Sequence, residues 1–335
     1  MQRGFLILWD LRSINLTGVD IMSMYKKILI CIVLLVPLSL TAAPYTKLVV
    51  FGDSLSDNGN LAFAATIPAT GLEHYNFLNQ PPYRHGFNNG DPAVLQLANL
   101  LNLPLTPSLY LVGLLEGNNF AVAGARAAGN LGIDLNAQVA TFLASQAGVA
   151  PNDALYIIFI GGNDIRDMRD AADDKTARTI LHNATHNIEN ALSQLHAAGA
   201  NHFLVVNSPD IGKIPETRAK ALASHNYHLI EQASRKTIAY NKELAETVQE
   251  TKKQKDVSIV LFDLFKFFNG IVGIGSAYHF SNTKEGCLIM ETTTYSTICD
   301  ENKIDSFIYL DQIHPTQRVH ERLGRALFAV IPEAN

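Results

Sequence analysis

The sequence has few cysteines, no excess of basic residues and no long apolar run. Its 335 residues include 3 cysteines, and 26 lysines and arginines stand against 31 aspartates and glutamates, giving a net charge of −5. Because proteins that grip nucleic-acid phosphates usually carry a basic excess, a nucleic-acid partner is disfavoured. Glycine (22) and proline (13) are too few for a collagen-like or low-complexity chain. With 47% hydrophobic residues, the chain is expected to be a folded enzyme or binding module.

The most apolar stretch lies near the N-terminus and is too short to cross a bilayer comfortably. It runs for thirteen residues from Ile28 to Leu40, whereas a membrane-spanning helix needs about 20. Basic residues precede it, and small residues ending at Ala43 follow it, which is typical of a secretory signal peptide. We therefore expect residues 1–43 to be an N-terminal extension with a signal peptide, and the mature chain to be secreted. An uncut N-terminal anchor is the alternative.

Two cysteines remain after the expected signal, which contains Cys31. Cys287 and Cys299 are separated by eleven residues, and in an oxidising compartment an even pair this close predicts one local disulfide. A reduced structural pair is the alternative. The loop insertion around residues 281–305 is interpreted as a lid or exposed loop near the site, and its part between Cys287 and Cys299 as a place where a processing protease would cut. The alternative is that this loop is an ordinary surface loop without a function.

Short apolar runs alternate with long helical stretches along the chain. The apolar runs are rich in β-branched residues and predict buried strands, and the helical stretches carry apolar residues at helical spacing. This alternation favours a single α/β domain over residues 44–335, in which helices cover both faces of a parallel sheet. The predicted strands are 47–51, 155–160, 202–206 and 257–261, and the predicted helices are 176–198, 216–253 and 315–331.

Two segments contain the residue types of a serine hydrolase. The run FGDSLSDNGN (51–60) places Ser54 at the carboxyl end of the first strand, where open α/β sheets bind ligands. The run DQIHP (311–315) places Asp311 three residues before His314, so the carboxylate can hold one ring nitrogen while the other faces the serine. Alone, the serine is explained as a helix cap and the histidine as a surface residue. Together they favour nucleophilic catalysis.

Acyl chemistry also needs hydrogen-bond donors for an oxyanion. The run NNFAVAGA (118–125) contains Gly124, and GGND (161–164) places Asn163 after a predicted strand. Each run alone is explained by a turn whose glycine permits special backbone angles. Beside the serine and histidine, Gly124 and Asn163 become candidate donors.

Together these segments resemble the GDSL-type esterases and lipases, also called SGNH hydrolases. Ser54, Gly124, Asn163 and His314 match the four sequence blocks of that family in order, and residues 81–90 resemble its early loop. The resemblance covers essentially the whole mature chain. It implies a three-layer α/β/α, flavodoxin-like fold and no metal or organic cofactor. The chain is similar in particular to secreted bacterial members that include lysophospholipases, phospholipases A and glycerophospholipid–cholesterol acyltransferases.

The resemblance also implies a role for each candidate residue. Ser54 would be the nucleophile, His314 the general base and acid, and Asp311 the residue that orients His314. The oxyanion donors would be the backbone N–H groups of Ser54 and Gly124 and the side chain of Asn163. The expected activity is hydrolysis of lipid acyl esters, lysophospholipids above all, at a membrane or micelle surface. Acyl transfer to cholesterol, a broader phospholipase A or carboxylesterase activity, and a non-catalytic secreted binding module on the same fold are the alternatives.

Two further features have competing interpretations. The aromatic residues of the irregular segment 61–90 are explained equally well by ordinary packing and by an acyl-chain pocket. His182 and His186 lie four residues apart on a predicted helix, a spacing that can bind a metal, but no third ligand accompanies them. A solvated helix surface is the favoured interpretation of the two histidines.

Overall fold

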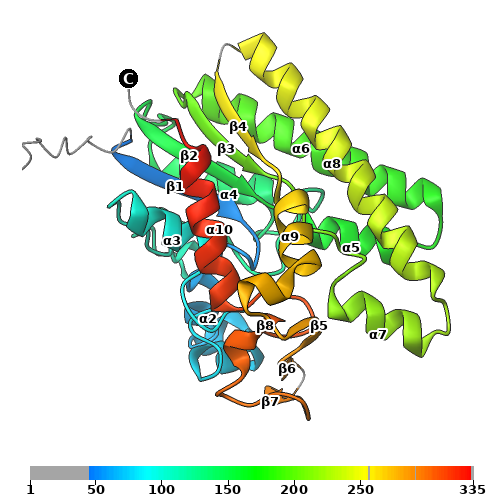
Figure 1. Cartoon of the computed structure of the whole chain (residues 1–335). Helices are drawn as coiled ribbons and strands as arrows, with labels where there is room; N and C mark the ends of the chain where they lie inside the picture. The colour runs from blue at the N-terminus through cyan, green and yellow to red at the C-terminus, as the bar shows by residue number, and fades with distance from the viewer. Residues whose placement is uncertain (1–44, 256, 291, 333–335) are drawn as a thin grey trace, which may run out of the picture. The chain divides into compact units, whose positions relative to one another are not determined.

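Four parallel strands form the central sheet of this chain, whose computed structural model describes residues 45–255, 257–290 and 292–332 (Figure 1). The strand order is β1-β2-β3-β4, and every residue of β2 is buried, as expected for a sheet covered on both faces. The predicted parallel α/β architecture is therefore confirmed, whereas the predicted signal peptide lies outside the described residues. The strands are β1 (Lys47–Gly52), β2 (Ala154–Phe159), β3 (His202–Val206) and β4 (Ser258–Phe262).

A short extended segment lies beside β1, on the side away from β2. The N–H of Val50 donates to the carbonyl oxygen of Asn118 at 3.0 Å, and the N–H of Phe120 donates to the carbonyl oxygen of Val50 at 2.7 Å. This segment occupies a fifth position in the sheet, which gives the spatial order of a flavodoxin-like fold. Gly124 follows four residues later, near the carboxyl end of β1.

Helices cover both faces of the sheet (Figure 1). Helices α3 and α10 pack against each other on one face, and α4, α5, α6 and α8 pack together on the other. The long helix α6 buries an apolar stripe that includes Ile188, Leu192 and Leu195, as the helical spacing predicts. The helices are α2 (Asn60–Ala64), α3 (Ala93–Leu100), α4 (Leu135–Ser145), α5 (Gly162–Asp170), α6 (Asp174–Ala197), α7 (Pro215–Ala223), α8 (His228–Lys255), α9 (Leu264–Gly273) and α10 (Gln317–Val330).

One predicted helix is two helices in the structure. The stretch 216–253 divides into α7 and α8 at a turn in which His225 has a φ of 52°. The N–H of Asn226 donates to the carbonyl oxygen of Ala221 at 3.0 Å, which closes the end of α7 as a helix-terminating turn does. The prediction was wrong here because the turn contains neither glycine nor proline, the residues that usually mark such a break.

The segment between α9 and α10 carries the disulfide loop. Cys287 and Cys299 are joined by an S–S bond of 2.06 Å, which confirms the predicted pair. Pro315 forms an antiparallel bridge with Tyr309, so α10 begins two residues later than predicted. The small strands of this segment are β5 (Asn282–Gly286), which pairs with β8 (Phe307–Tyr309), and β6 (Leu288–Ile289), which pairs with β7 (Thr294–Tyr295).

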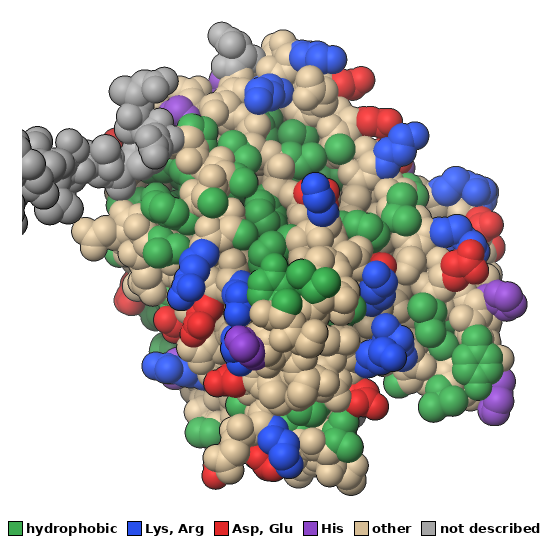
Figure 2. All heavy atoms as spheres, in the orientation of Figure 1, with side chains coloured by type: hydrophobic (Ala, Val, Ile, Leu, Met, Phe, Trp, Pro, Cys, Tyr) green, Lys and Arg blue, Asp and Glu red, His purple; other side chains and the backbone are tan. Residues whose placement is uncertain are grey.

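Two apolar clusters stabilise this arrangement. The larger fills the space between the sheet and its helices, and the smaller joins the aromatic segment 61–90 to the disulfide loop. On the face drawn in Figure 2, charged side chains of both signs are interspersed among apolar ones. No helix among the described residues combines the length and apolarity needed to span a bilayer. The smaller cluster includes Leu61, Leu78, Tyr83, Phe87, Cys287 and Leu288.

Candidate active site

Ser54 lies in the turn that follows β1. The carbonyl oxygen of Asp53 accepts the N–H groups of Ser56 and Asp57, both at 3.0 Å, and its side chain accepts the N–H of Leu55 at 3.0 Å. Burial of Asp53 raises the pKa of its carboxyl to about 7. These bonds fix the turn, so that Ser54 is held at the carboxyl end of β1.

Ser54, His314 and Asp311 form a continuous hydrogen-bonded series. The Ser54 Oγ lies 2.9 Å from His314 Nε2. The other ring nitrogen, Nδ1, lies 2.9 and 3.0 Å from the two carboxylate oxygens of Asp311. His314 is 4% exposed and Asp311 is fully buried. The hydroxyl is therefore within proton-transfer reach of an imidazole whose second nitrogen is held by a carboxylate.

The Asp311 carboxylate accepts several hydrogen bonds besides that of the imidazole. Its Oδ1 accepts the backbone N–H groups of Ile313 and His314, both at 2.8 Å, and its Oδ2 accepts the Tyr83 hydroxyl at 3.0 Å. Burial acts to raise the pKa of Asp311, but His314 and the hydrogen bonds lower it below the ordinary value. The carboxylate is thus ionised at neutral pH and can stabilise an imidazolium.

An aromatic ring packs on the imidazole. The ring of Phe87 stacks on that of His314, with centroids 4.6 Å apart and planes inclined by 19°. Tyr75, Phe77 and Tyr83 in turn pack edge-on against Phe87. This packing leaves the imidazole few alternative orientations.

Three donors of the kind an oxyanion needs lie at the same cleft as Ser54. Among the described residues, the backbone N–H groups of Ser54 and Gly124 donate to no protein acceptor. Gly124 has a φ of 86°, a conformation that favours glycine. Asn163 uses one N–H of its amide to donate to the carbonyl oxygen of Ala125 at 3.0 Å, which leaves the second N–H for a ligand.

Asp57 joins the serine turn to the loop that carries Gly124. Its buried carboxylate accepts the backbone N–H groups of residues 59–61 and of Ala123, at distances of 2.8 to 3.2 Å. Burial raises the pKa of Asp57 despite these four bonds. This carboxyl therefore fixes the position of one candidate oxyanion donor relative to the serine.

The cleft at Ser54 has a volume of about 330 Å³ and walls that are mostly apolar. Three aromatic residues of the segment 61–90 line it, while other residues of that segment pack internally, so both interpretations of these aromatics apply. Met290 also lines the cleft, which places the disulfide loop at the site. The apolar lining residues are Leu61, Tyr75, Phe77, Phe87, Ala123, Met290 and Ile313.

Comparison with known proteins identifies the family. The model of the GDSL-like lipase/acylhydrolase family matches residues 48–327. This chain belongs to that family. It is 28% identical over 281 residues to a GDSL esterase/lipase of Arabidopsis thaliana, a match that covers 72% of each chain. It is 26% identical over 284 residues to the phosphatidylcholine-sterol acyltransferase of Aeromonas hydrophila, covering 78% of this chain and 72% of that protein.

A solved structure is also similar to this GDSL-family chain. The acetylxylan esterase Axe2 of Geobacillus stearothermophilus aligns over 88% of this chain and 99% of its own, with 14% sequence identity and a TM-score of 0.46. Membership of the family supports an ester hydrolase activity. The resemblance inferred from the sequence motifs is therefore confirmed.

The histidine pair with metal-ligand spacing lies away from this cleft. His182 and His186 are exposed on α6, and each lies near one glutamate, Glu243 at 3.5 Å and Glu189 at 3.6 Å. The part of the chain that the structure describes contains no group of three or more histidine, cysteine, aspartate or glutamate side chains arranged for a metal.

Sequence reasoning missed three residues that contact the site. Tyr83 and Phe87 fall within the family-like loop 81–90 and among the aromatic residues of the segment 61–90, for which an acyl-chain pocket is one of the two interpretations. Nothing in the sequence indicates their contacts with Asp311 and His314. Arg166, three residues after Asn163, also lines the cleft.

Proposed function

We propose that this GDSL-family chain is a secreted serine ester hydrolase that cleaves acyl esters of lipids, with lysophospholipids as the favoured substrates. The observation that carries the proposal is the hydrogen-bonded series of Ser54, His314 and Asp311 at the head of an apolar cleft. Serine, imidazole and carboxylate, together with N–H donors for the oxyanion, supply the groups that the proposed acyl transfer uses, so the proposed mechanism uses no metal or organic cofactor.

The reaction begins when Ser54 Oγ attacks the ester carbonyl carbon and its proton passes to Nε2 of His314. The carbonyl oxygen becomes an oxyanion, which the N–H groups of Ser54 and Gly124 and the amide of Asn163 bind. The carbon–oxygen bond to the alcohol then breaks as His314 returns the proton to the leaving oxygen. Water, deprotonated by the same imidazole, releases the acyl group from Ser54 as a carboxylic acid.

The walls of the cleft support an alkyl chain as the acyl substituent. Tyr75, Phe77 and Phe87 form one aromatic side of the cleft, and Leu61 and Met290 add aliphatic surface. Burying a methylene group is worth about 0.8 kcal/mol, so each carbon that enters the cleft strengthens binding. An interface of lipid with water, as in a membrane or micelle, is the proposed source of such a substrate.

The acyl group on Ser54 can also be transferred to an acceptor other than water. A sterol hydroxyl can replace water as the acceptor, with the same proton transfer to His314 and the same release of Ser54. The Aeromonas relative, whose name describes transfer to a sterol, supports this alternative.

We also propose that the disulfide loop acts as a lid and is the segment that a processing protease would cut. The N–H of Met290 donates to Gln312 Oε1 at 3.0 Å, and the N–H of Leu288 donates to the carbonyl oxygen of Leu310 at 2.7 Å. The loop thus contacts the residues that lead into the catalytic histidine. Tyr295, farther along the loop, is exposed and open to a protease.

Secretion is supported by the chemistry of the same loop. Disulfides form and persist in oxidising compartments, such as the bacterial periplasm and the extracellular medium. Fractionation of the producing cells would test this, since recovery of the protein with reduced cysteines in the cytosol would contradict it.

The decisive experiment offers lysophospholipid, phospholipid and p-nitrophenyl esters to the purified protein, with and without cholesterol. We expect fatty acid release from lysophospholipid, and a loss of roughly four to six orders of magnitude in Ser54→Ala. The control is Ser276→Ala, because Ser276 is exposed and outside the cleft. Cholesteryl ester formed in place of fatty acid would identify an acyltransferase. Failure to turn over any ester would favour the non-catalytic module and contradict the proposal.

A further inference from the structure

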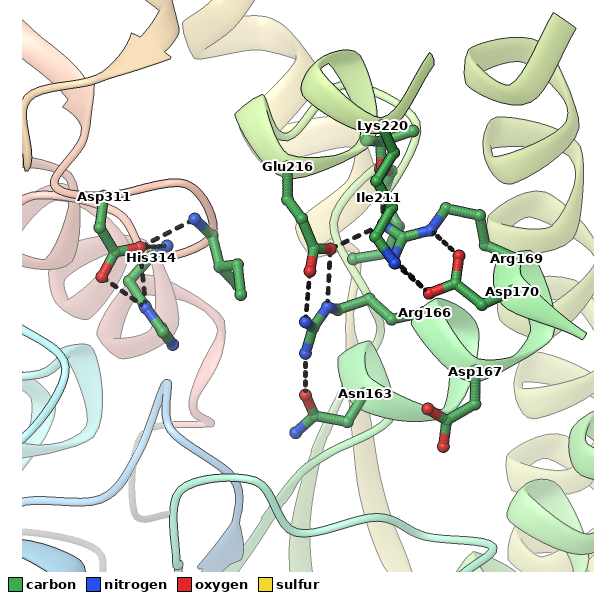
Figure 3. A network of polar contacts seen from close by, with 12 residues as sticks. Asn163, Arg166, Asp167, Arg169, Asp170, Ile211, Glu216, Lys220, Asp311 and His314 are labelled. Atoms are coloured by element: carbon green, nitrogen blue, oxygen red, sulfur yellow. Dashed lines mark hydrogen bonds and ion pairs between the residues drawn. The ribbon is translucent and has the colours of Figure 1, made fainter. Parts of the chain in front are cut away.

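Both ends of the Asn163 amide are hydrogen-bonded. Its Nδ2 donates to the carbonyl oxygen of Ala125 at 3.0 Å, and its Oδ1 accepts Nη1 of Arg166 at 2.9 Å (Figure 3). Turning the amide by 180° would set its oxygen against the Ala125 carbonyl and its nitrogen against the guanidinium. Two hydrogen bonds would then be replaced by two repulsive contacts. The two partners therefore decide which amide atoms face the cleft.

Arg166 is itself held in place by a carboxylate. Its Nε and Nη2 donate to the two carboxylate oxygens of Glu216 at 2.9 and 2.6 Å, a bidentate arrangement. Arg169, whose side chain is fully buried, donates to the same carboxylate at 2.7 Å. Burial acts to raise the pKa of Glu216, but the two arginines lower it to about 2. The carboxylate is therefore charged at neutral pH and the guanidinium of Arg166 has one orientation.

The same glutamate contacts the loop that carries the catalytic histidine. The backbone N–H of Glu216 donates to the carbonyl oxygen of Gln312 at 2.8 Å, one residue after Asp311. Figure 3 shows the guanidinium of Arg166 between Glu216 on α7 and Asn163, with the Asp311–His314 pair to the left. The first turn of α7 thus bonds both to the residue that orients Asn163 and to the loop of the general base.

From this geometry we infer that Arg166, clamped by Glu216, positions and polarises the Asn163 amide for oxyanion binding. The inference rests on the proposed function, in which Asn163 donates to the oxyanion. A cationic donor on Oδ1 withdraws electron density from the amide, so the remaining N–H becomes a stronger donor. Arg166 also lines the cleft beside Ser54, so the amide that it orients is held next to the nucleophile.

The test replaces Arg166 by methionine, whose unbranched side chain substitutes for the aliphatic part of the arginine and carries no N–H donor. Loss of a whole oxyanion donor lowers kcat by roughly 10²- to 10³-fold. We expect Arg166→Met to lower kcat for a p-nitrophenyl ester about 10- to 100-fold, with KM changed less than about threefold. Arg235→Met is the control, because Arg235 is exposed on α8 and pairs with Glu231. An effect on KM alone, or none on either constant, would overturn the inference.

A double-mutant cycle separates action through Asn163 from a general structural role. In an Asn163→Ala background, Arg166→Met should lower kcat by less than about threefold, because the residue it positions is already gone. If the two losses multiply, Arg166 acts independently and the inference is wrong. Arg166→Lys keeps the charge with a single donor group and should recover part of the lost kcat.

A second variant is needed in case Arg166→Met fails to fold, because that substitution leaves the Glu216 carboxylate with one partner fewer. Glu216→Gln keeps Arg166 and weakens its ion pair with residue 216, along with the bond from Arg169 to the same carboxylate. We therefore expect kcat to fall about 3- to 10-fold without a matching change in KM. Unchanged kcat in this variant would refute the clamp. Thermal unfolding of each variant confirms that the kinetic comparison is made on folded protein.

Failure of the proposed function gives a different result. In that case Ser54→Ala would hydrolyse the ester as fast as the unmodified protein. A normal kcat in Arg166→Met together with an inactive Ser54→Ala would refute the positioning role alone.

Discussion

Replacing Asp311 by asparagine tests the hydrogen-bonded series at its buried end. In the active tautomer His314 carries its hydrogen on Nδ1, directed at Asp311, and leaves Nε2 to accept the proton of Ser54. The Oδ1 position of Asp311 accepts two backbone N–H groups, so the oxygen of an asparagine would take that position. Its nitrogen would then lie at the Oδ2 position, 2.9 Å from Nδ1.

The magnitude follows from the two donors that this substitution sets against each other. In the active tautomer, the asparagine N–H and the His314 Nδ1–H would face each other in a buried space. Each unsatisfied buried donor costs about 1–3 kcal/mol, so the active tautomer becomes about 2–6 kcal/mol less favourable. At about 1.4 kcal/mol for each factor of ten, kcat should fall by roughly 30- to 10⁴-fold.

The assay compares kcat for a p-nitrophenyl ester and the rate at which a phosphonate or sulfonyl fluoride labels Ser54. Both rates should fall together in Asp311→Asn, because both reactions need the same base to take the Ser54 proton. Asp305→Asn is the matched control, since it makes the same change at an exposed position six residues earlier. Retention of more than a third of kcat in Asp311→Asn, or labelling of a residue other than Ser54, would refute the reasoning.

Three further predictions follow from other contacts. Tyr83→Phe removes the hydroxyl that donates to Asp311, and should lower kcat about 3- to 10-fold in steady-state kinetics, whereas an unchanged kcat would show that this bond is dispensable. Replacing Cys287 and Cys299 by serine should lower the free energy of unfolding by at most about 3 kcal/mol in chemical denaturation, and a stability equal to that of the parent would contradict a constraining role. The pKa of Glu216, about 2, lies below its ordinary value of 4.5, so its charge stabilises the fold above pH 4.5 and this contribution is lost as the pH falls toward 2. This lost contribution to the free energy of unfolding is about 2 kcal/mol after solvent screening, and Glu216→Gln should no longer show it. If the free energy of unfolding of Glu216→Gln falls between pH 4.5 and 2 as steeply as that of the parent, the ionised Glu216 does not make this contribution.

Much of the fold follows from short-range sequence pattern. The four strands lie within one residue of their predicted limits, because each is a short apolar run rich in β-branched residues. The first three are buried along nearly all of their length. The break between α7 and α8 did not follow, because His225 adopts a left-handed conformation that its residue type does not signal. The order of the strands rests on contacts between distant segments, which periodicity alone does not contain.

The candidate site likewise contains residues that the sequence predicted and residues that it did not. The motif residues around Ser54 and His314 stand out because their types and spacing are unusual for a turn. Tyr83 and Glu216 do not, since each acts through a contact with a residue far away in the sequence: Asp311 lies 228 residues after Tyr83, and Glu216 lies 50 residues after Arg166. Arg166 has a local signal, its position three residues after Asn163 on α5, but its role depends on the glutamate.

The loop that carries His314 is therefore positioned by its neighbours as much as by its own turn. Tyr83 bonds to the Asp311 carboxylate from the aromatic segment, Met290 bonds to the Gln312 side chain from the disulfide loop, and Glu216 bonds to the Gln312 backbone from α7. Three segments separated in sequence thus fix one short turn. A hydrogen bond of 2.9 Å to Ser54 tolerates little displacement, because catalysis declines steeply when reacting groups are misplaced by about 1 Å. Changes in any of the three segments should consequently affect kcat even where they do not touch the substrate.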